Sequence, residues 1–257
     1  MRKMGGLYLV GIGLGEKGIS VKGLEIARKS DMVLLDSYTN VIDENKVKTL
    51  SGLIGKEVRL ADRTSLEENI DPLIEESKKK RICILVPGDP LLGTTHISIV
   101  VRARELGVKC EVIPGASIFS SIGLTGLSPY KFGRTVTIPH LEKSFKPRSF
   151  YYQIKLNKDV GLHTLVLLDT ERGGMSPSVA VTILDEIENE ERLGVVSNSD
   201  LIFVLSRIGE ENQHICLDRL ESVISKEFGP PPHSLVLPGK IDEVEREMIK
   251  ALFGVEV

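Results

Sequence analysis

The chain has 257 residues, of which 33 are Lys or Arg and 36 are Asp or Glu, so its formal net charge is −3. This length is enough for one large α/β domain or two smaller ones. The near balance of charge gives no strong basic field that would favour nucleic acid or an anionic membrane, and no apolar run approaches the roughly 18 residues that span a bilayer. The apolar stretch behind the basic start breaks into glycines, unlike a signal peptide. We therefore expect a cytoplasmic protein with neither nucleic-acid nor membrane partners.

The three cysteines, Cys83, Cys110 and Cys216, are far apart, and each lies in an apolar, strand-like context. Their odd number, without metal-ligand or disulfide spacing, indicates small core residues in a reducing compartment.

The first half of the chain alternates short apolar runs with segments of helical periodicity. Ser20 stands where the N-cap of the first helix belongs. Strands separated by helices of about ten to fifteen residues indicate βαβ units and a parallel sheet. Strands are predicted at 7–10, 32–35, 57–61, 82–86 and 108–113, and helices at 21–29, 42–54, 66–79 and 97–106.

The amino-acid composition changes after residue 113, where small and turn-forming residues dominate the stretch PGASIFSSIGLTGLSPYKFG. We expect a domain crossing there, with an N-terminal domain over 1–115 and a C-terminal domain over 116–257. Further strands are predicted in TVTIP, HTLVLLD, DLIFVLSRIG and HSLVLPGK, and further helices over 179–187 and 242–253. The sequence thus predicts an α/β protein of two α/β domains, with a mainly parallel N-terminal sheet and a mixed C-terminal sheet.

The stretch LVPGDPLLGTTH, residues 85–96, follows an apolar strand with two prolines in four residues. Proline removes a backbone donor and keeps its neighbour out of the α region, so neither helix nor sheet ladder continues through this turn. One interpretation is a plain connection, in which Thr94 or Thr95 caps the next helix. The other is a ligand loop, in which Asp89 and the amides after it lie at the carboxyl edge of the sheet, where open α/β folds bind ligands.

GIGLG, residues 11–15, also follows a strand directly. Glycines at this spacing let a backbone approach a ligand and invite comparison with a dinucleotide-binding Rossmann turn. In that turn the last glycine opens a helix, whereas here the next helical period begins only near Ser20. Asp36 lies at the end of the second strand, where a Rossmann fold has the acidic residue that binds ribose, but only its position matches. The segment is either a tight turn or a binding loop of another kind.

PGASI, residues 114–118, repeats the order of strand, turn and apolar segment. The Ser117 hydroxyl and nearby amides would be donors to a ligand. The alternative is a turn that links the two domains.

GPPPHSLVLPGK, residues 229–240, begins with three prolines that fix an extended entry to a strand. His233 could act as a base, but a single histidine before a strand is usually structural, and we favour a backbone contact. His96, His140 and His214 have no companions at metal-ligand spacing, so no metal site is predicted. Several strand ends with Gly/Pro turns suggest one cleft that holds a ligand mainly through main-chain groups.

LYLVGIGLG, VPGDPL and VIPGAS together resemble the tetrapyrrole methylase superfamily. The resemblance implies that S-adenosylmethionine is bound in a cleft between two α/β domains, without a Rossmann fingerprint. It also implies that the Gly-Asp-Pro turn is part of the cofactor pocket, where its rigidity is preorganisation.

Within that superfamily the chain is similar to the diphthine synthase branch, through ISVKGLE, GDPLLGTTH, GLTGLSPYKFG, VGLHTLVLLD and FGPPPHSLVLPGK. This similarity implies a homodimer that methylates the amino group of a 3-amino-3-carboxypropyl-histidine in translation elongation factor 2. Repeated transfer from S-adenosyl-L-methionine would give the trimethylammonium product diphthine, with S-adenosyl-L-homocysteine as the second product.

Carried over by position, the resemblance also implies a set of cofactor contacts from both domains. No catalytic residue is assigned, because holding an amine in line with an activated methyl group can by itself supply up to roughly 10 kcal/mol. The implied contacts are Leu14, Asp89, Leu92, Ser117, Ile118, Leu168, Ile208 and His233.

Three departures from the branch bear on the substrate. The motif PGAS, which contains Ala116, is closer to that of the porphyrin and corrin methylases. Phe145 stands where the branch often has a tryptophan. The segment 170–178 is shorter than the insertion that some relatives have there. A tetrapyrrole C-methyltransferase is therefore the alternative function. A noncatalytic adenosine-nucleotide sensor and a NAD-linked oxidoreductase are further alternatives, the last opposed by the missing helix-opening glycine.

Overall fold

The computed structural model describes residues 5–257 apart from 16, 39–41, 43 and 143–145. The chain divides into two compact units. Met1–Ile118 together with Gly209–Glu211 forms the first unit, and Phe119–Ile208 together with Asn212–Val257 forms the second.

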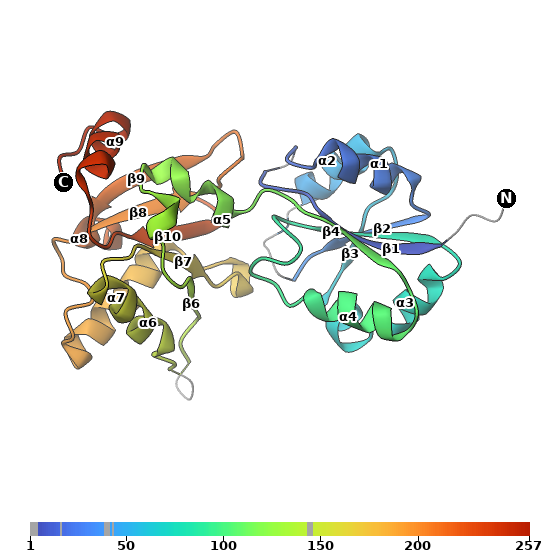
Figure 1. Cartoon of the computed structure of the whole chain (residues 1–257), viewed down its shortest axis with the longest axis horizontal. Helices are drawn as coiled ribbons and strands as arrows, with labels where there is room; N and C mark the ends of the chain where they lie inside the picture. Colours follow the sequence, from blue (N-terminus) through green and yellow to red (C-terminus); the bar gives the residue numbers. More distant parts are fainter. Residues whose placement is uncertain (1–4, 16, 39–41, 43, 143–145) are drawn as a thin grey trace. The chain divides into compact units, whose positions relative to one another are not determined.

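The first unit contains a parallel five-stranded sheet in the order β3-β2-β4-β1-β5 (Figure 1). This confirms the predicted parallel sheet. The strands are apolar along most of their length because helices cover both faces of the sheet. They are β1 (Gly6–Gly11), β2 (Met32–Asp36), β3 (Arg59–Ala61), β4 (Arg81–Val86) and β5 (Cys110–Ile113).

Alternate residues of each strand supply the two hydrophobic cores of this unit. Leu7 and Leu9 pack on the side of α3 and α4, whereas Val10 packs on the side of α1 and α2 (Figure 1). Cys83 is fully buried in the second of these cores, as predicted. The helices are α1 (Val21–Lys29), α2 (Glu44–Ile54), α3 (Asp71–Ser77) and α4 (Ile97–Glu105), with a π-helical turn η1 (Thr64–Glu68) before α3.

The predicted single helix over 66–79 is wrong, because the segment forms η1 and then α3. Pro72 lies in the first turn of α3, the part of a helix that tolerates proline, so a helix cannot run through it from further back. The N-cap prediction for α1 is confirmed: the Ser20 hydroxyl accepts from the N–H of Gly23 at 3.1 Å.

The N-cap prediction for α4 is wrong. His96 occupies the cap position and makes no side-chain cap bond. The Thr94 hydroxyl instead donates to the carbonyl oxygen of Pro90 at 2.6 Å, and the Thr95 hydroxyl donates to Glu67. The contact of Thr94 is local to its loop, whereas Glu67 lies 28 positions from Thr95, so local sequence does not reveal that second contact.

The second unit contains a mixed five-stranded sheet in the order β6-β7-β10-β8-β9, in which β6 and β7 are parallel and the other pairs antiparallel (Figure 1). This confirms the predicted mixed sheet. The strands are β6 (Val136–Ile138), β7 (Thr164–Leu168), β8 (Leu201–Ser206), β9 (His214–Arg219) and β10 (His233–Leu237).

Two helices of the second unit, α8 and α6, are not predicted from the sequence, and α6 is the longer of the two. Its aromatic residues Phe150 and Tyr151 suit a strand as well as a helix, and their burial in the core selects the helix. The helices are α5 (Ile118–Ser121), α6 (Ser149–Asp159), α7 (Pro177–Glu191), α8 (Leu220–Ile224) and α9 (Glu243–Phe253), with short turns η2 (Ile122–Thr125), η3 (Pro129–Lys131) and η4 (Glu171–Gly173).

Candidate functional site

Three glycine-containing loops meet at the carboxyl edge of the first sheet, after β1, β4 and β5. Gly13 and Gly88 exchange two backbone hydrogen bonds, with N···O distances of 3.2 and 2.9 Å. A Cβ atom on Gly115 would lie 2.3 Å from the carbonyl oxygen of Gly88, and a Cβ atom on Gly11 would lie 2.7 Å from the same oxygen. The backbones therefore touch in a way that no side chain permits. We name Gly11, Gly13, Gly88 and Gly115 the glycine cradle.

Asp89 joins two of the loops of the glycine cradle. Its Oδ2 accepts a hydrogen bond from the N–H of Gly115 at 3.1 Å, and its Oδ1 accepts one from the N–H of Leu91 at 2.9 Å. The half-buried carboxylate thus fixes the loop after β4 and ties it to the loop after β5. The contacts of Asp89 are therefore those of a residue that fixes the loop.

Leu14 lies in a turn that is fixed from two sides. A Cβ atom on Gly209 would lie 2.6 Å from the Cβ of Leu14, and one on Gly15 would lie 2.1 Å from the carbonyl oxygen of Gly209. The Leu14 side chain is half-buried. Because α1 begins only at Val21, no helix N-terminus follows the turn directly, which confirms the argument against a Rossmann fingerprint.

The other implied contacts of this unit differ in exposure. Leu92 is 45% exposed, while Ser117 is 5% exposed and follows Gly115 of the cradle by two positions. Ile118 is half-buried and begins α5. Ala116, between the cradle and Ser117, is exposed. The structure therefore brings Leu14, Asp89 and Ser117 to loops at one edge of one sheet.

In the second unit, His233 has partners at both ring nitrogens. Its Nδ1 lies 2.8 Å from the Ser206 hydroxyl, and its Nε2 lies 3.2 Å from the carbonyl oxygen of Gly229. A carbonyl only accepts, so Nε2 carries the proton and Nδ1 accepts from Ser206. Burial lowers the pKa of His233 below its usual value. A neutral ring with both nitrogens occupied suits a structural histidine, in line with the preference over a base.

The remaining two implied contacts lie at the same end of the second sheet as His233. His233 pairs with Ser206 across β10 and β8, and Ile208 follows two residues later. Leu168 ends β7, the other neighbour of β10. Both apolar side chains are buried. Arg207 stands between Ser206 and Ile208 in the sequence. Its guanidinium donates to the carbonyl oxygens of Phe228 and Pro230, each at 2.7 Å, and so holds the proline segment before His233.

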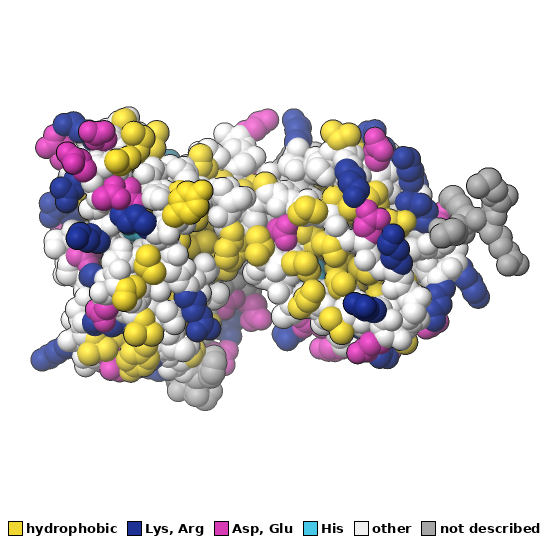
Figure 2. Space-filling view, viewed as in Figure 1, with side chains coloured by type: hydrophobic (Ala, Val, Ile, Leu, Met, Phe, Trp, Pro, Cys, Tyr) yellow, Lys and Arg dark blue, Asp and Glu magenta, His cyan; other side chains and the backbone are white. Residues whose placement is uncertain are grey.

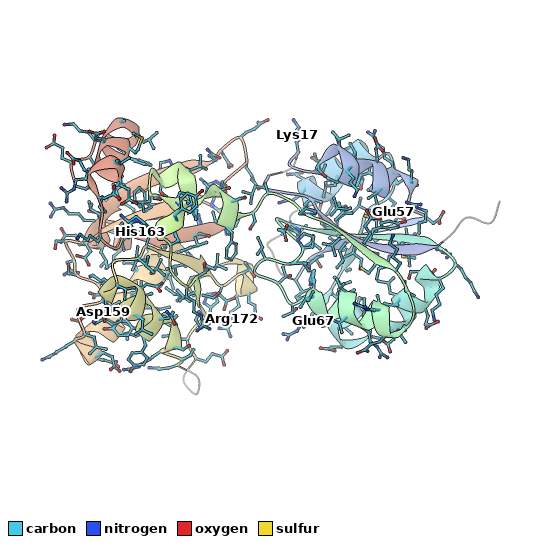
Figure 3. The ribbon with its side chains drawn as sticks, viewed as in Figure 1. Lys17, Glu57, Glu67, Asp159, His163 and Arg172 are labelled. Atoms are coloured by element: carbon cyan, nitrogen blue, oxygen red, sulfur yellow. The ribbon has the colours of Figure 1, made fainter. Side chains whose placement is uncertain are left out.

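Sequence reasoning missed a polar cluster in the first unit. Its members lie at or after the carboxyl ends of β2, β3 and β4, and all five have hydrogen-bond partners within the cluster. Asp36 was noted only by position and His96 only for lacking metal-ligand neighbours. The available signal was that parallel strands end at one edge, so polar residues just after them come together. The members are Asp36, Tyr38, Glu67, Thr95 and His96, and Figure 3 labels Glu67.

The described residues contain no group of three or more His, Cys, Asp or Glu arranged to hold a metal ion. Nor does any helix in the described part of the chain combine the length and apolarity needed to cross a membrane. On the face drawn in Figure 2, basic and acidic side chains are interspersed. Phe145 lies outside the described residues.

Comparison with known proteins gives consistent matches over most of the chain. Residues 6–224 match the model of the tetrapyrrole (corrin/porphyrin) methylases. The diphthine methyl ester synthase of Schizosaccharomyces pombe is 38% identical, with 95% of this chain and 93% of that protein aligned. The diphthine synthase of Methanocaldococcus jannaschii is 33% identical, with 96% of this chain and 98% of that protein aligned.

A solved structure matches the fold of the whole chain. The crystal structure of a putative diphthine synthase from Entamoeba histolytica superposes with a TM-score of 0.87 at 33% identity, and the match covers 97% of this chain and 98% of that chain.

Proposed function

The chain belongs to the tetrapyrrole methylase family and is a methyltransferase, and we propose that it transfers methyl groups from S-adenosylmethionine to the 3-amino-3-carboxypropyl-histidine of translation elongation factor 2. The observation that carries the proposal is the alignment of nearly the whole chain with relatives named for diphthine or its methyl ester. The reaction is a step of diphthamide biosynthesis.

The glycine cradle supports the cofactor part of the proposal. Bound S-adenosylmethionine supplies a methyl group activated by its sulfonium. Cβ atoms on Gly11, Gly13 and Gly115 would lie within 3 Å of backbone atoms, so these positions carry no side chains and a ligand at this sheet edge meets main-chain groups. The Asp89 carboxylate lies beside them and would favour a positively charged group electrostatically. The chain's part is to hold the donor and exclude water.

Eight side chains stay as predicted cofactor contacts. Leu14, Asp89 and Ser117, which adjoin the glycine cradle, are the first candidates, because they lie on loops that backbone contacts hold together. The full set of eight is Leu14, Asp89, Leu92, Ser117 and Ile118 from the first unit, and Leu168, Ile208 and His233 from the second unit.

The test is the intact mass of elongation factor 2 that carries the 3-amino-3-carboxypropyl-histidine, before and after incubation with this protein and S-adenosylmethionine. Three added methyl groups are expected for diphthine, and a fourth would match the methyl ester in the name of the yeast relative. No mass change, with cofactor binding measured separately by calorimetry, would overturn the acceptor. Incubation with uroporphyrinogen or a precorrin would then test the tetrapyrrole alternative.

The proposal includes a homodimer in the cytoplasm. Apolar side chains that are 65%, 45% and 59% exposed recur every four residues on α9, at Val244, Met248 and Leu252. Such a stripe supports a second copy as its cover. Light scattering of the wild-type chain and of Met248→Glu tests this: a dimer mass that the substitution halves is expected, and a monomer mass for the wild type would refute it.

A further inference from the structure

The loop between β4 and α4 links two different sites along the carboxyl edge of the first sheet. β4 is the central strand, with β1 and β5 on one side and β2 and β3 on the other (Figure 1). At its start the loop is tied by Asp89 to Gly115, after β5. At its end, His96 is tied to Asp36, in β2. The glycine cradle, through Gly88, and the polar cluster, through Thr95 and His96, thus share one loop of ten residues, 87–96.

The polar cluster forms a chain of contacts from the core to the surface. His96 Nε2 lies 3.0 Å from Asp36 Oδ2, and these two side chains are 1% and 0% exposed. His96 Nδ1 lies 3.3 Å from the hydroxyl oxygen of Tyr38. Tyr38 is half-buried and its hydroxyl donates to Glu67 Oε1 at 3.0 Å. The Glu67 side chain is 22% exposed and also pairs with Arg63, at 2.8 Å.

These contacts leave one place for an extra proton. The Asp36 carboxylate only accepts, so it holds the proton of His96 on Nε2. Nδ1 then presents a lone pair to Tyr38. When Nδ1 gains a proton, it donates to the Tyr38 oxygen, and the Tyr38 hydroxyl then directs its remaining proton at Glu67.

Tyr38 can relay a proton, but its hydroxyl does not stay ionised. Burial raises the pKa of Tyr38 to about 12, and neighbouring Glu67 acts in the same direction. A hydrogen bond from Thr95 keeps the pKa of Glu67 below its usual value despite partial burial, so Glu67 remains a carboxylate. The Glu67 carboxylate, which is 22% exposed, lies beside the Tyr38 hydroxyl and attracts a cationic group such as an ammonium.

We propose that Tyr38, backed by His96 and Asp36, takes the proton from the substrate ammonium that must leave before each N-methylation. This inference rests on the proposed function and deepens it. The ammonium gives its proton to the Tyr38 oxygen as Tyr38 passes its own proton to His96 Nδ1. The freed nitrogen lone pair then forms the N–C bond, and the C–S bond of the donor breaks with its electron pair left on sulfur. His96 releases the proton to solvent before the next transfer. Tyr38 is the catalytic residue, and His96 and Asp36 are positioning residues that hold the proton.

The chemistry of repeated transfer gives this chain of residues a specific task. The first and second methylations each leave a nitrogen that still carries a proton, whereas the third leaves a quaternary nitrogen with none. Transfer to a carboxylate oxygen, as in a methyl ester, needs no proton removal. The cluster should therefore matter for the amine steps and not for an ester step.

The experiment compares wild type with Tyr38→Phe in single-turnover methyl transfer between pH 6 and 10, with mono-, di- and trimethyl products resolved by mass. Tyr38→Phe should lower the rate near pH 7 by about 10²-fold or more. The loss should shrink by about tenfold per pH unit as the amine deprotonates in solution. Cofactor affinity, measured by calorimetry, should be unchanged. Tyr130→Phe, on a side chain that is 97% exposed, is the matched control.

A loss that is equal at every pH, or no loss, would overturn the proposal and leave the cluster as an anchor of the loop. If the wild type also forms a methyl ester, that step should proceed in Tyr38→Phe at the wild-type rate. His96→Gln keeps a polar side chain but cannot hold the proton, and it should reproduce the pH-dependent loss. ¹⁵N NMR of the wild type without cofactor should show the His96 proton on Nε2, and a proton on Nδ1 alone would contradict the inference. If the wild type itself leaves elongation factor 2 unchanged, the proposed function fails instead.

Discussion

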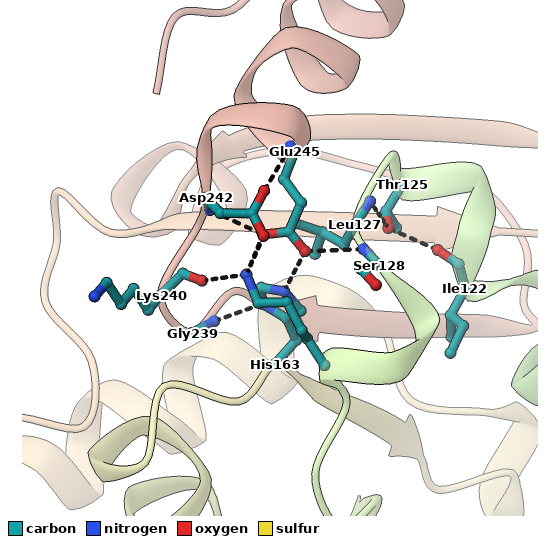
Figure 4. A network of polar contacts seen from close by, with 10 residues as sticks. Ile122, Thr125, Leu127, Ser128, His163, Gly239, Lys240, Asp242 and Glu245 are labelled. Carbon is teal, nitrogen blue, oxygen red and sulfur yellow. Dashed lines mark hydrogen bonds and ion pairs between the residues drawn. The ribbon is translucent and has the colours of Figure 1, made fainter.

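Nε2 of His163 lies 2.9 Å from Oε1 of Glu245 in the second unit, and the two side chains are 0% and 3% exposed (Figure 4). The N–H of Gly239 donates to Nδ1 of the same ring at 2.8 Å. The ring proton therefore sits on Nε2 and is directed at the carboxylate. Glu245 also accepts from the N–H of Ser128 at 2.9 Å and pairs with Lys131. The start of β7 is thus joined to the first turn of α9.

Glu245→Ala should lower the free energy of unfolding of the second unit by about 1–3 kcal/mol, because the buried ring N–H of His163 and the N–H of Ser128 lose their acceptor. Lys131 loses one of its two carboxylate partners and keeps Asp242. Urea denaturation of the full chain measures this. Glu247→Ala, on the exposed side of the same helix, should change the value by no more than about 0.5 kcal/mol. Equal effects of the two variants would mean that the network contributes little.

Acid should destabilise the second unit through this network. Burial lowers the pKa of His163, against the opposing effect of Glu245. Burial alone would raise the pKa of Glu245, but hydrogen bonds, first that of Lys131, bring it below its ordinary value. Both groups bind protons more readily when unfolded, so their stabilisation is present above pH 6.5 for His163 and above 4.5 for Glu245, and is lost as pH falls through the folded values.

The His163 part of this effect can be isolated with His163→Gln, which does not titrate. Between pH 7 and 5.5, the midpoint of thermal unfolding should fall more steeply in the wild type than in the variant. Two curves of the same slope would show that His163 does not set the pH dependence in this range.

Gly115→Ala should disrupt the glycine cradle. The new Cβ would lie 2.3 Å from the carbonyl oxygen of Gly88 and 2.9 Å from the nitrogen of Gly13, so the loops must separate. Overpacking of this kind costs about 1–3 kcal/mol, and we expect S-adenosylmethionine affinity to fall by about tenfold or more. Gly52→Ala, where a Cβ meets nothing within 4 Å, is the matched control. Calorimetric titration of both variants with S-adenosylmethionine measures this. Unchanged affinity in Gly115→Ala would show that the cofactor does not bind at the glycine cradle.

Asp89→Asn separates loop fixing from charge at the cofactor site. The amide keeps an oxygen that can accept from one of the two backbone donors, Leu91 or Gly115, but it carries no charge. If the charge acts on the sulfonium, Asp89→Asn should weaken affinity and turnover as much as Asp89→Ala does. If Asp89 only fixes the loop, the asparagine variant should lie between alanine and wild type. Wild-type affinity and turnover in Asp89→Ala would refute both roles.

Ser206→Ala tests the structural reading of His233. Loss of the hydroxyl leaves Nδ1 of a buried ring without its donor, at a cost of about 1–3 kcal/mol of stability. The shape of the pH–rate profile should not change, because His233 transfers no proton. A shifted profile in Ser206→Ala would identify His233 as a base after all.

Local sequence determined much of this protein. The alternation of short apolar runs with helical periods predicted the parallel sheet, because both faces of each βαβ unit are covered by the helices between its strands. Ser20 capped the predicted helix, since capping depends only on residues three positions apart. The stretch of sequence between GIGLG and the start of α1 at Val21 excludes a Rossmann turn. The Gly/Pro turns after separate strands predict ligand loops at the sheet edge.

Tertiary structure alone decided which distant residues meet. Asp36 and His96 are 60 positions apart, and His163 and Glu245 are 82 apart, yet each pair forms a buried contact because of strand order and helix packing. The Thr95 hydroxyl donates to Glu67, 28 positions away, instead of capping α4. Periodicity says which face of an element is buried, but it carries no information on which element will lie against that face. The glycine cradle was therefore visible in the sequence as separate turns, and the polar cluster was not visible at all.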